Sequence, residues 1–340
     1  MIKSVLIANR GEIAIRIART ARRMGIKTYV VRTAKEPEAV YLSAADAVIN
    51  FPETDGNIPE FLDIDRLVGL AREYKIDSLH PGYGYLSENA ELAERCRDNG
   101  IVFIGPSPEV IRLMGDKVAA KGIAAQSGVP MLGASQGAVH TLDEARKIAK
   151  RLGYPVIIKA VSGGGGRGMR IVHHQDELEQ LYKIATAEAQ VAFNDPSVFI
   201  EKYLENPKHI EFQIVADNYG NVVHLGEREC SIQRKHQKLM EEAPSPALDE
   251  RLRKKMAAAA VSLAKQAGYQ SLGTVEFLLD HQKHFYFMEM NTRIQVEHPV
   301  TEEITGIDLV ELQFNIAAGR KLPLRQSQIH LNGWSIECPI

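Results

Sequence analysis

The sequence predicts a mixed fold, in which an α/β unit is followed by an α+β unit of antiparallel strands. In the first third, short apolar strands alternate with amphipathic helices, which is typical of a parallel, doubly wound sheet. In the middle, a glycine-rich segment joins two apolar strands directly, and in the last third strands follow one another across short turns. Because 340 residues exceed one typical hydrophobic core, roughly two or three packed units are expected.

The composition excludes several classes of protein. With 41 basic and 43 acidic residues, the chain has no net charge that would attract nucleic acid or an anionic membrane, so anion binding must be local. The apolar run at the N-terminus is too short for a signal sequence, and no run approaches a transmembrane span. The three scattered cysteines disfavour a zinc site or a disulfide scaffold. We therefore expect a cytoplasmic protein with neither a nucleic-acid nor a membrane partner.

Apolar periodicity defines the elements of the first third. Residues 5–8 predict a buried strand, followed by a helix with Ile13, Ile17 and Ala21 on its inner face and Gly25 at its end. Further strands are expected at residues 28–31, 47–49, 78–79 and 102–104, and further helices at residues 60–74 and 89–97.

Two loops of the first third differ in what they imply. A dinucleotide-binding turn needs several spaced glycines, but the first strand-to-helix turn contains only Gly11. Residues 80–89 (HPGYGYLSEN) instead follow the carboxyl end of a strand, where open α/β sheets place their ligand sites. This loop is a candidate ligand site, and the alternative is an ordinary tight turn.

The glycine-rich loop at residues 162–168 (SGGGGRG) joins two predicted strands. It matches the G-x-G-x-x-G pattern, but residues 169–172 after it predict a strand, whereas a dinucleotide loop leads into a helix. A glycine-rich hairpin with Lys159 on its incoming strand is typical of a flap over nucleotide phosphates, as in protein kinases. The alternative, a flexible surface linker, does not explain a lysine within an apolar strand.

Two polar segments follow apolar strands further along. The strand at residues 198–204 contains Glu201 and Lys202, which are candidates for contacting the edge of an adenine base. After a strand pair at residues 209–225, the charged run 227–238 directly continues an apolar strand. That continuity favours a pocket-lining role over a solvated surface.

Residues 284–297 (HFYFMEMNTRIQVE) carry the strongest prediction of a site. The aromatic start predicts a central strand, and an extended chain would place alternate residues on one face, namely Glu289, Asn291, Arg293, Gln295 and Glu297. Hard oxygens suit Mg²⁺, a guanidinium can hold an anion through two N–H groups, and Glu297 is a candidate base. The alternative, a solvated edge strand, fits the aromatic start poorly.

Glu276 lies in a second apolar strand, at residues 273–279. An unpaired buried carboxylate is costly, so this group needs a cation. If this strand pairs with residues 284–291, Glu276 lies near Glu289, and both could bind a divalent metal with Asn291.

The chain resembles the biotin carboxylases, which are ATP-grasp ligases, in motifs that cover essentially its whole length: ANRGEIAIR, HPGYGYLSENA, FIGPSPEVIRLMGDK, PVIIKAVSGGGGRGMR, EKYLENPKHIEFQ, ERECSIQRKHQKL and EMNTRIQVEHPVTE. The resemblance implies a Rossmann-like N-terminal domain without a dinucleotide, followed by an ATP-grasp fold with a glycine-rich lid. The expected domains are residues 1–114, a helical linker at 115–131, the lid domain at 132–204 and the catalytic domain at 205–340.

The resemblance also implies roles for individual residues. Near the phosphates of ATP it places Lys117, Lys159, Gly165, Gly166 and His236. Around adenine and ribose it places Glu201, Lys202, Leu204 and His209, with Gln233 as a further cofactor-binding residue. It assigns Glu276, Glu289 and Asn291 to Mg²⁺ or Mn²⁺, and Lys238, Arg293, Gln295 and Val296 to bicarbonate. Glu297 is then the base, and Tyr83 lies beside biotin.

The implied reaction is ATP-dependent carboxylation of biotin with bicarbonate, through carboxyphosphate. The implied partners are a biotin carboxyl carrier protein or domain and a carboxyltransferase, with a homodimer in the full-length form. Arg16 and Arg19, on the expected outer face of the first helix, would suit that dimer contact. The final acceptor (pyruvate, 2-oxoglutarate or an acyl-CoA) is set by a carboxyltransferase that this sequence does not contain.

The chain departs from the family pattern near its end. The family continues after IEC with an arginine, where this chain has Pro339, and a C-terminally truncated member is expected. The alternative function is therefore a fragment that binds Mg·ATP with only residual ATPase activity. Half of a carbamoyl-phosphate synthetase, another ATP-grasp ligase, is disfavoured by TRIQVEHPVTE together with HPGYG.

Overall fold

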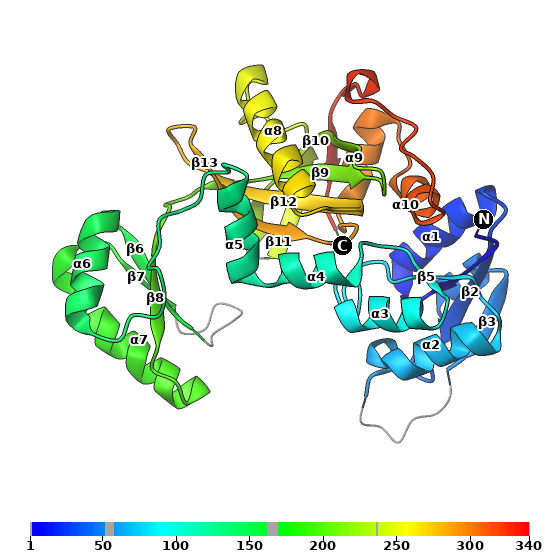
Figure 1. Cartoon of the computed structure of the whole chain (residues 1–340), viewed down its shortest axis with the longest axis horizontal. Helices are drawn as coiled ribbons and strands as arrows, with labels where there is room; N and C mark the ends of the chain where they lie inside the picture. The colour runs from blue at the N-terminus through cyan, green and yellow to red at the C-terminus, as the bar shows by residue number, and fades with distance from the viewer. Residues whose placement is uncertain (1, 52–57, 162–168, 236, 340) are drawn as a thin grey trace. The chain divides into compact units, whose positions relative to one another are not determined.

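The computed structural model describes residues 2–51, 58–161, 169–235 and 237–339 (Figure 1). The chain divides into two compact units. The first comprises Met1–Val129, Lys208–Leu279 and Phe287–Ile340, and the second comprises Pro130–Pro207 and Asp280–Tyr286. No helix in the described ranges is both long and apolar enough to cross a membrane.

A five-stranded parallel sheet in the order β3-β2-β1-β4-β5 begins the first unit. Its strands are β1 (Ser4–Ile7), β2 (Lys27–Arg32), β3 (Ala47–Asn50), β4 (Ser78–His80) and β5 (Val102–Phe103). The accompanying helices are α1 (Gly11–Arg23), α2 (Ile64–Glu73), α3 (Ala90–Asp98) and α4 (Pro108–Gly115). The alternation predicted from the sequence is confirmed, and Ile13, Ile17 and Ala21 of α1 are buried as expected.

One of the two arginines expected on the outer face of α1 forms ion pairs within the chain. Arg16 Nη2 lies 2.6 Å from Glu302 Oε1 and 3.0 Å from Asp308 Oδ1, so its guanidinium is engaged within the chain. Helical periodicity alone does not predict these ion pairs, because Glu302 and Asp308 lie far along the chain.

A six-stranded antiparallel sheet in the order β13-β12-β9-β10-β11-β14 forms the rest of the first unit. Its strands are β9 (Lys208–Ala216), β10 (Val222–Arg234), β11 (Gln237–Ala243), β12 (Ser271–Leu279), β13 (Phe285–Asn291) and β14 (Ser335–Glu337). The helices of this part are α5 (Lys117–Gln126), α8 (Glu250–Gln266), α9 (His298–Thr305) and α10 (Leu309–Ala317). The predicted pairing of β12 with β13 is confirmed, but the expected central position of β13 is wrong, because β13 is an edge strand of the described sheet.

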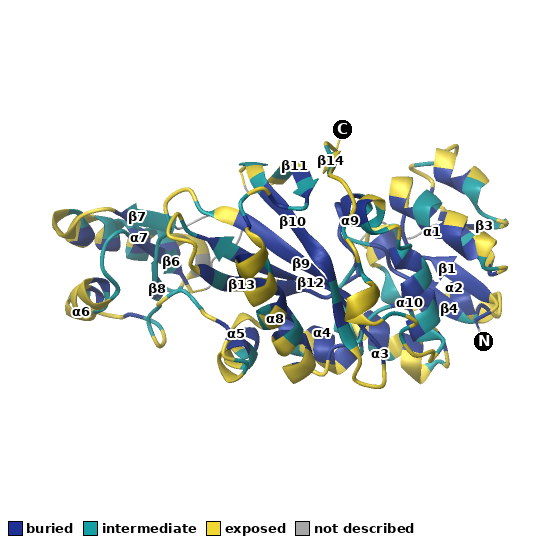
Figure 2. Ribbon diagram, turned by 90° about the horizontal axis from the view of Figure 1, so that it is seen from above, coloured by how far each residue is buried: buried dark blue, intermediate teal, exposed yellow. Residues whose placement is uncertain are grey.

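The middle of this sheet is deeply buried (Figure 2). All nine residues of β12 pair with β9 in one continuous antiparallel register, in which Glu276 stands opposite Glu211. On the other side of β9, Arg228 of β10 also stands opposite Glu211. Since residues directly opposite each other point to the same face, these three charged side chains form a row across β10, β9 and β12.

The second unit is a three-stranded antiparallel sheet in the order β7-β6-β8 with two helices packed on it. Its elements are α6 (Leu142–Leu152), β6 (Val156–Ala160), β7 (Met169–Val172), α7 (Leu178–Phe193) and β8 (Val198–Lys202). The predicted antiparallel pairing of β6 with β7 is confirmed. Short 3-10 helices in the two units cover Val40–Ala44, Glu60–Leu62, Gln175–Glu177 and Gln326–Gln328.

The polar segment after β13 differs from its prediction. The extended chain expected up to Glu297 is wrong, because β13 ends at Asn291 and the chain turns into α9. In the turn that follows β13, the Thr292 N–H donates to Glu88 Oε1 at 2.9 Å, a contact that the sequence pattern does not reveal. Strict alternation of faces therefore does not apply beyond Asn291.

Candidate active site

The row of charges across the six-stranded sheet contains a completely buried ion pair. Arg228 Nε donates to Glu211 Oε1 at 2.5 Å, and neither side chain is exposed. The remaining donors of Arg228 contact the side-chain oxygens of Gln213, Thr274 and Thr301 at 2.8 to 3.1 Å. Burial alone would raise the pKa of Glu211, but the charges of Arg228 and Lys238 outweigh it and hold that pKa well below its ordinary value.

Lys238 joins three carboxylates. Its Nζ donates to Glu211 Oε2 at 2.5 Å, to Glu297 Oε1 at 2.5 Å and to Glu276 Oε1 at 3.1 Å. Burial would lower the pKa of the ammonium, but the three carboxylates outweigh burial and raise it. Lys238 is therefore a fixed cation at the centre of the site, and it was found from the family resemblance.

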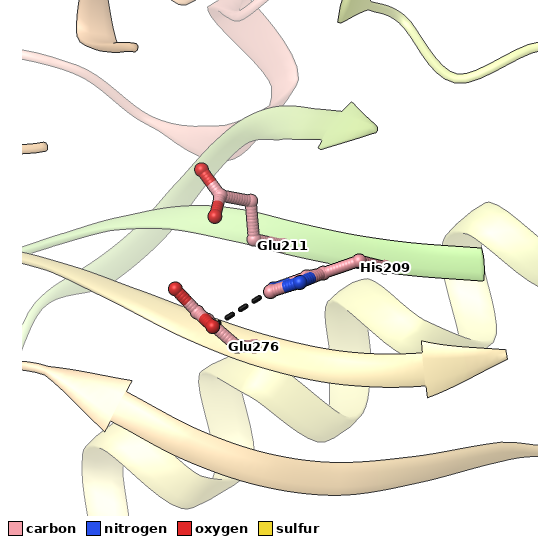
Figure 3. A group of neighbouring side chains, drawn as sticks. All are labelled: His209, Glu211 and Glu276. Carbon is pink, nitrogen blue, oxygen red and sulfur yellow. Dashed lines mark ion pairs between the residues drawn. The ribbon is translucent and has the colours of Figure 1, made fainter. Parts of the chain in front are cut away.

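His209 lies on the same face of β9 as Glu211 (Figure 3). Its Nε2 is 2.8 Å from Glu276 Oε2 on β12, and its Nδ1 is 2.8 Å from Gln233 Nε2. Burial would lower the pKa of the imidazole, but the neighbouring Glu276 outweighs burial and raises it. His209, Glu211 and Glu276 are close enough to share one cation, and the ammonium of Lys238 contacts both glutamates.

Glu297 occupies the N-cap position of α9, but its side chain does not cap the helix and instead reaches Lys238. The residue is 3% exposed. Burial and then the charge of Glu211 raise the pKa of this carboxyl, although Lys238 and Arg228 oppose them. Raised proton affinity together with a fixed cation suits a general base.

Arg293 is held on several sides. Its Nε donates to Glu88 Oε2 at 2.8 Å, its Nη1 to Gln295 Oε1 at 2.9 Å and its Nη2 to Asn291 Oδ1 at 3.2 Å. The Nη1 and Nη2 groups therefore meet two amide oxygens, and Nη1 also donates to the Ile294 carbonyl oxygen at 3.3 Å. An anion that binds these two groups must displace at least one of these oxygens.

The predicted metal ligands lie on neighbouring strands, β12 and β13. Glu289 has a raised pKa because of burial and of the nearby Glu276 charge, opposed by Lys117. Burial would raise the pKa of Glu276, but contacts with His209 and Lys238 outweigh burial and lower that pKa instead. Carboxylate oxygens of this kind are the ligands that a divalent cation prefers. Asn291 donates its Nδ2 to Glu276 Oε1 at 2.7 Å, so its amide must turn to offer oxygen to a metal.

Tyr83 lies in the loop after β4, and this loop is braced from β1. Asn9 Nδ2 donates to the carbonyl oxygens of Pro81 and Tyr83, both at 2.7 Å. The Tyr83 hydroxyl donates to Glu12, and burial together with that contact raises the pKa of the phenol. Gly82 has a φ of +64°, and a Cβ there would lie 2.8 Å from Asn9 Nδ2, so a side chain at this position would strain the loop.

The second unit contains its own group of predicted residues. Lys159 Nζ on β6 donates to Glu201 Oε2 on β8 at 2.5 Å. Lys202 Nζ donates to the carbonyl oxygens of Gly153 and Tyr154 at 3.0 and 2.9 Å, and burial lowers its pKa. Leu204 lies two residues after the end of β8 and is half-buried.

The remaining predicted residues have different positions. Lys117 is the first residue of α5 and is exposed, whereas Gln295 is buried and Val296 is 37% exposed. The predicted flap with Gly165 and Gly166, and His236, lie outside the described residues. Sequence reasoning did not single out Glu88, Glu211 or Arg228. For Glu211 the available signal was a charge inside a largely apolar strand, the pattern that singled out Glu276. Arg228 lies between Glu227 and Glu229, in the run 227–238 that was expected to line a pocket.

Two family models match the chain in succession. The model "Biotin carboxylase, N-terminal domain" matches residues 1–111, and the model "Carbamoyl-phosphate synthase L chain, ATP binding domain" matches residues 116–325. The biotin carboxylase of Nostoc sp. is 54% identical over 336 residues, which cover 99% of this chain and 75% of that protein.

Solved structures agree with these matches. The biotin carboxylase of Campylobacter jejuni, crystallised as a β-γ-ATP complex, has a TM-score of 0.90 at 48% identity, covering 99% of this chain and 75% of that one. The biotin carboxylase domain dimer of Hydrogenobacter thermophilus 2-oxoglutarate carboxylase, in complex with MgADP, ADP and bicarbonate, has a TM-score of 0.88 at 48% identity, covering 99% of this chain and 74% of that one. The predicted mixed fold and the family resemblance are thus confirmed, and the chain belongs to the biotin carboxylase family of ATP-dependent ligases.

Proposed function

We propose that the first unit carries the centre at which bicarbonate, ATP and biotin react to give carboxybiotin, ADP and phosphate. The observation that supports this most directly is the position of Glu297. Its buried carboxylate lies 2.5 Å from the fixed ammonium of Lys238 and has a raised pKa. A carboxylate becomes a better general base as its pKa rises toward the operating pH, and a neighbouring cation can orient an anionic substrate beside it.

In the proposed reaction, Glu297 takes the proton of bicarbonate. The resulting oxyanion attacks the γ-phosphorus of ATP, which gives carboxyphosphate and ADP. Carboxyphosphate then collapses to CO₂ and phosphate, the phosphate takes the N1′ proton of biotin, and the biotin enolate attacks CO₂. Water must be kept from carboxyphosphate, because this intermediate hydrolyses readily.

Bicarbonate is proposed to lie against Arg293, Lys238, Gln295 and Val296. The Nη1 and Nη2 groups of Arg293 can hold two oxygens of an anion once the amide oxygen of Asn291 or Gln295 turns away. The same turn would let the Asn291 oxygen join Glu276 and Glu289 in binding Mg²⁺ or Mn²⁺. When bound, the ion neutralises charge on the ATP phosphates.

The nucleotide-binding residues proposed from the family resemblance are found in each unit separately. Lys159, Glu201, Lys202 and Leu204 belong to the second unit, and Lys117, His209, Gln233 and His236 to the first. Gly165 and Gly166 of the flap complete the set. Lys159 forms an ion pair with Glu201, and in the proposed complex it exchanges this carboxylate for a phosphate, so that its charge is paired both before and after ATP binds.

The proposed partners and oligomeric state follow from the family. Biotin would be presented beside Tyr83 by a carrier protein or domain, a carboxyltransferase would use the carboxybiotin, and the longer form would be a homodimer. The named relatives are biotin carboxylases or domains of larger carboxylases. The three cysteines are free, which supports a cytoplasmic location.

Bicarbonate-dependent phosphate release from ATP, with and without free biotin, tests the proposal. We expect Glu297→Gln to lower this rate at least about 100-fold, because general-base catalysis contributes on the order of 10²–10⁴, while Mg·ATP affinity changes by less than about twofold. Glu303→Gln is the matched control, since Glu303 is an exposed carboxylate on the same helix.

The outcomes separate the two functions under consideration. Phosphate release that requires bicarbonate, rises with biotin and is lost in Glu297→Gln supports the carboxylase reaction. Mg·ATP binding with slow phosphate release that responds to neither compound supports the nucleotide-binding alternative. Failure to bind ATP would contradict both.

A further inference from the structure

Glu88, at the end of the loop after β4, contacts the segment that follows β13, 204 residues further along the chain. One of its carboxylate oxygens accepts the backbone N–H of Thr292 at 2.9 Å and the Thr292 hydroxyl at 3.3 Å. Its other oxygen accepts Arg293 Nε–H at 2.8 Å. We propose that Glu88 is a positioning residue that sets the direction in which the Arg293 guanidinium faces an anion; this inference rests on the proposed role of Arg293 in binding bicarbonate.

The loop that carries Glu88 is fixed at both of its ends. At its start, the buried His80 accepts the Gly82 N–H at Nδ1, 3.1 Å away, and its Nε2 lies 3.2 Å from Gln313 Oε1. At its end, Asn89 caps α3 by accepting the Leu92 N–H at 2.8 Å. Glu88 is therefore adjacent to a helix cap, and its backbone cannot follow a movement of Arg293.

The geometry of Arg293 shows which edge of its guanidinium Glu88 leaves available to an anion. A guanidinium has two edges that can hold an anion through two N–H groups, one formed by Nε with an Nη and the other by the two Nη groups. Glu88 occupies Nε, which leaves the Nη1–Nη2 edge directed at Gln295 Oε1 and Asn291 Oδ1. The amide nitrogens of those two residues point to Glu276 Oε1, at 3.5 and 2.7 Å. Glu88 thus turns the anion-binding edge toward the buried charges rather than toward solvent.

A spectroscopic signature tests the contact without turnover. A charge-assisted hydrogen bond slows exchange of the Nε proton, so ¹⁵N NMR should show a protected Nε–H signal that is assigned to Arg293 by its absence in Arg293→Lys. We expect this signal to lose its protection in Glu88→Ala and to be partly retained in Glu88→Gln, whose amide oxygen still accepts. A signal that stays protected in Glu88→Ala would overturn the proposal.

Kinetics distinguish positioning from a general structural role. We expect Glu88→Ala to raise the KM for bicarbonate about tenfold, the effect of losing one charge-assisted hydrogen bond, with a change below about twofold in the KM for ATP. Glu88→Gln should recover part of the loss. Glu91→Ala, at an exposed glutamate in the first turn of α3, is the matched control and should change neither constant.

A double-mutant cycle separates the two contacts of Glu88. If Glu88 acts through the guanidinium, Glu88→Ala has little further effect on the KM for bicarbonate in an Arg293→Lys background. A full tenfold effect in that background would show that Glu88 acts through Thr292 instead and would overturn the proposal. Absence of bicarbonate-dependent turnover in the unmodified chain would refute the proposed function, and the NMR signal would still decide whether Glu88 holds Arg293.

Discussion

The ion pairs at the two candidate sites differ in burial. In the first unit, Arg228 and Glu211 are completely buried, and the donors of Arg228 also contact three neutral side chains. In the second unit, the side chains of Lys159 and Glu201 are 38% and 19% exposed. The two pairs have similar N–O distances but very different surroundings.

This difference indicates two uses of charge. A buried charge that loses its partner is strongly destabilising, so the Arg228–Glu211–Lys238 group must stay assembled whether or not a ligand is bound. A half-exposed pair can be separated at little cost in free energy, because water solvates the two separated charges. The first unit therefore supplies fixed charges for the reaction, and Lys159 of the second unit supplies a charge that a ligand can recruit.

The largest expected effect comes from breaking the buried pair. Arg228→Met leaves Glu211 with Lys238 as its remaining cation and removes the partner of Gln213, Thr274 and Thr301. We expect the free energy of unfolding to fall by about 3–5 kcal/mol, measured by urea denaturation. Arg146→Met, which removes an exposed cation from α6, is the control and should change little. Equal losses in both variants would contradict the contrast between the sites.

A smaller, pH-dependent effect is expected at the edge of the buried charges. Burial, with the charges of Glu297 and Glu337, raises the pKa of Glu241 from 4.5 to about 7. The folded state therefore binds this proton more tightly than the unfolded state. The resulting stabilisation is complete below pH 4.5 and is lost as the pH rises through 7.

The variant Glu241→Gln cannot ionise at this position, so it should not lose stability as the pH rises through 7. We expect the variant to be more stable than the unmodified chain at pH 8, by up to about 3 kcal/mol, and nearly equal to it at pH 5. Denaturation at the two pH values measures the difference, with Glu303→Gln as the exposed control. A variant that is less stable at pH 8 would show that Glu241 is ionised and well paired there.

The smallest effect is expected in the second unit. Glu201→Gln breaks the ion pair with Lys159 at a half-exposed position, so the free energy of unfolding should change by about 0–1 kcal/mol. Lys159→Met should behave similarly in denaturation yet weaken ATP binding, measured by calorimetry. A loss above about 2 kcal/mol in either variant would mean that this pair is as structural as the buried one.

Much of the fold could be predicted because its signals are local. The strands alternating with helices in the first third, the hairpin of β6 and β7 and the pairing of β12 with β13 depend on patterns within about 30 residues. The extended chain after Asn291 was predicted wrongly, and in the turn found there the Thr292 N–H donates to Glu88, 204 residues away. Periodicity carries no information about such a distant acceptor.

The site was predicted only in part for the same reason. Glu276 and Glu297 stood out as carboxylates in unusual positions, whereas Arg228 is one of several charges on β10 and Glu211 lies on a different strand. The sheet order β13-β12-β9-β10-β11-β14 and the register opposite Glu211 bring them together. Neither the order nor the register follows from composition or spacing, so the buried ion pair became visible only with the fold.

The position of Glu297 at the first turn of α9 has a further consequence. Aligned peptide dipoles give the N-terminus of a helix a partial positive charge, which favours a nearby anion. The Glu297 side chain makes no cap hydrogen bond and contacts Lys238 instead, so the helix field acts on the carboxylate only through space. The proton affinity of the proposed base is thus tempered by the peptide backbone itself, a contribution that no side-chain substitution can remove while α9 stays folded.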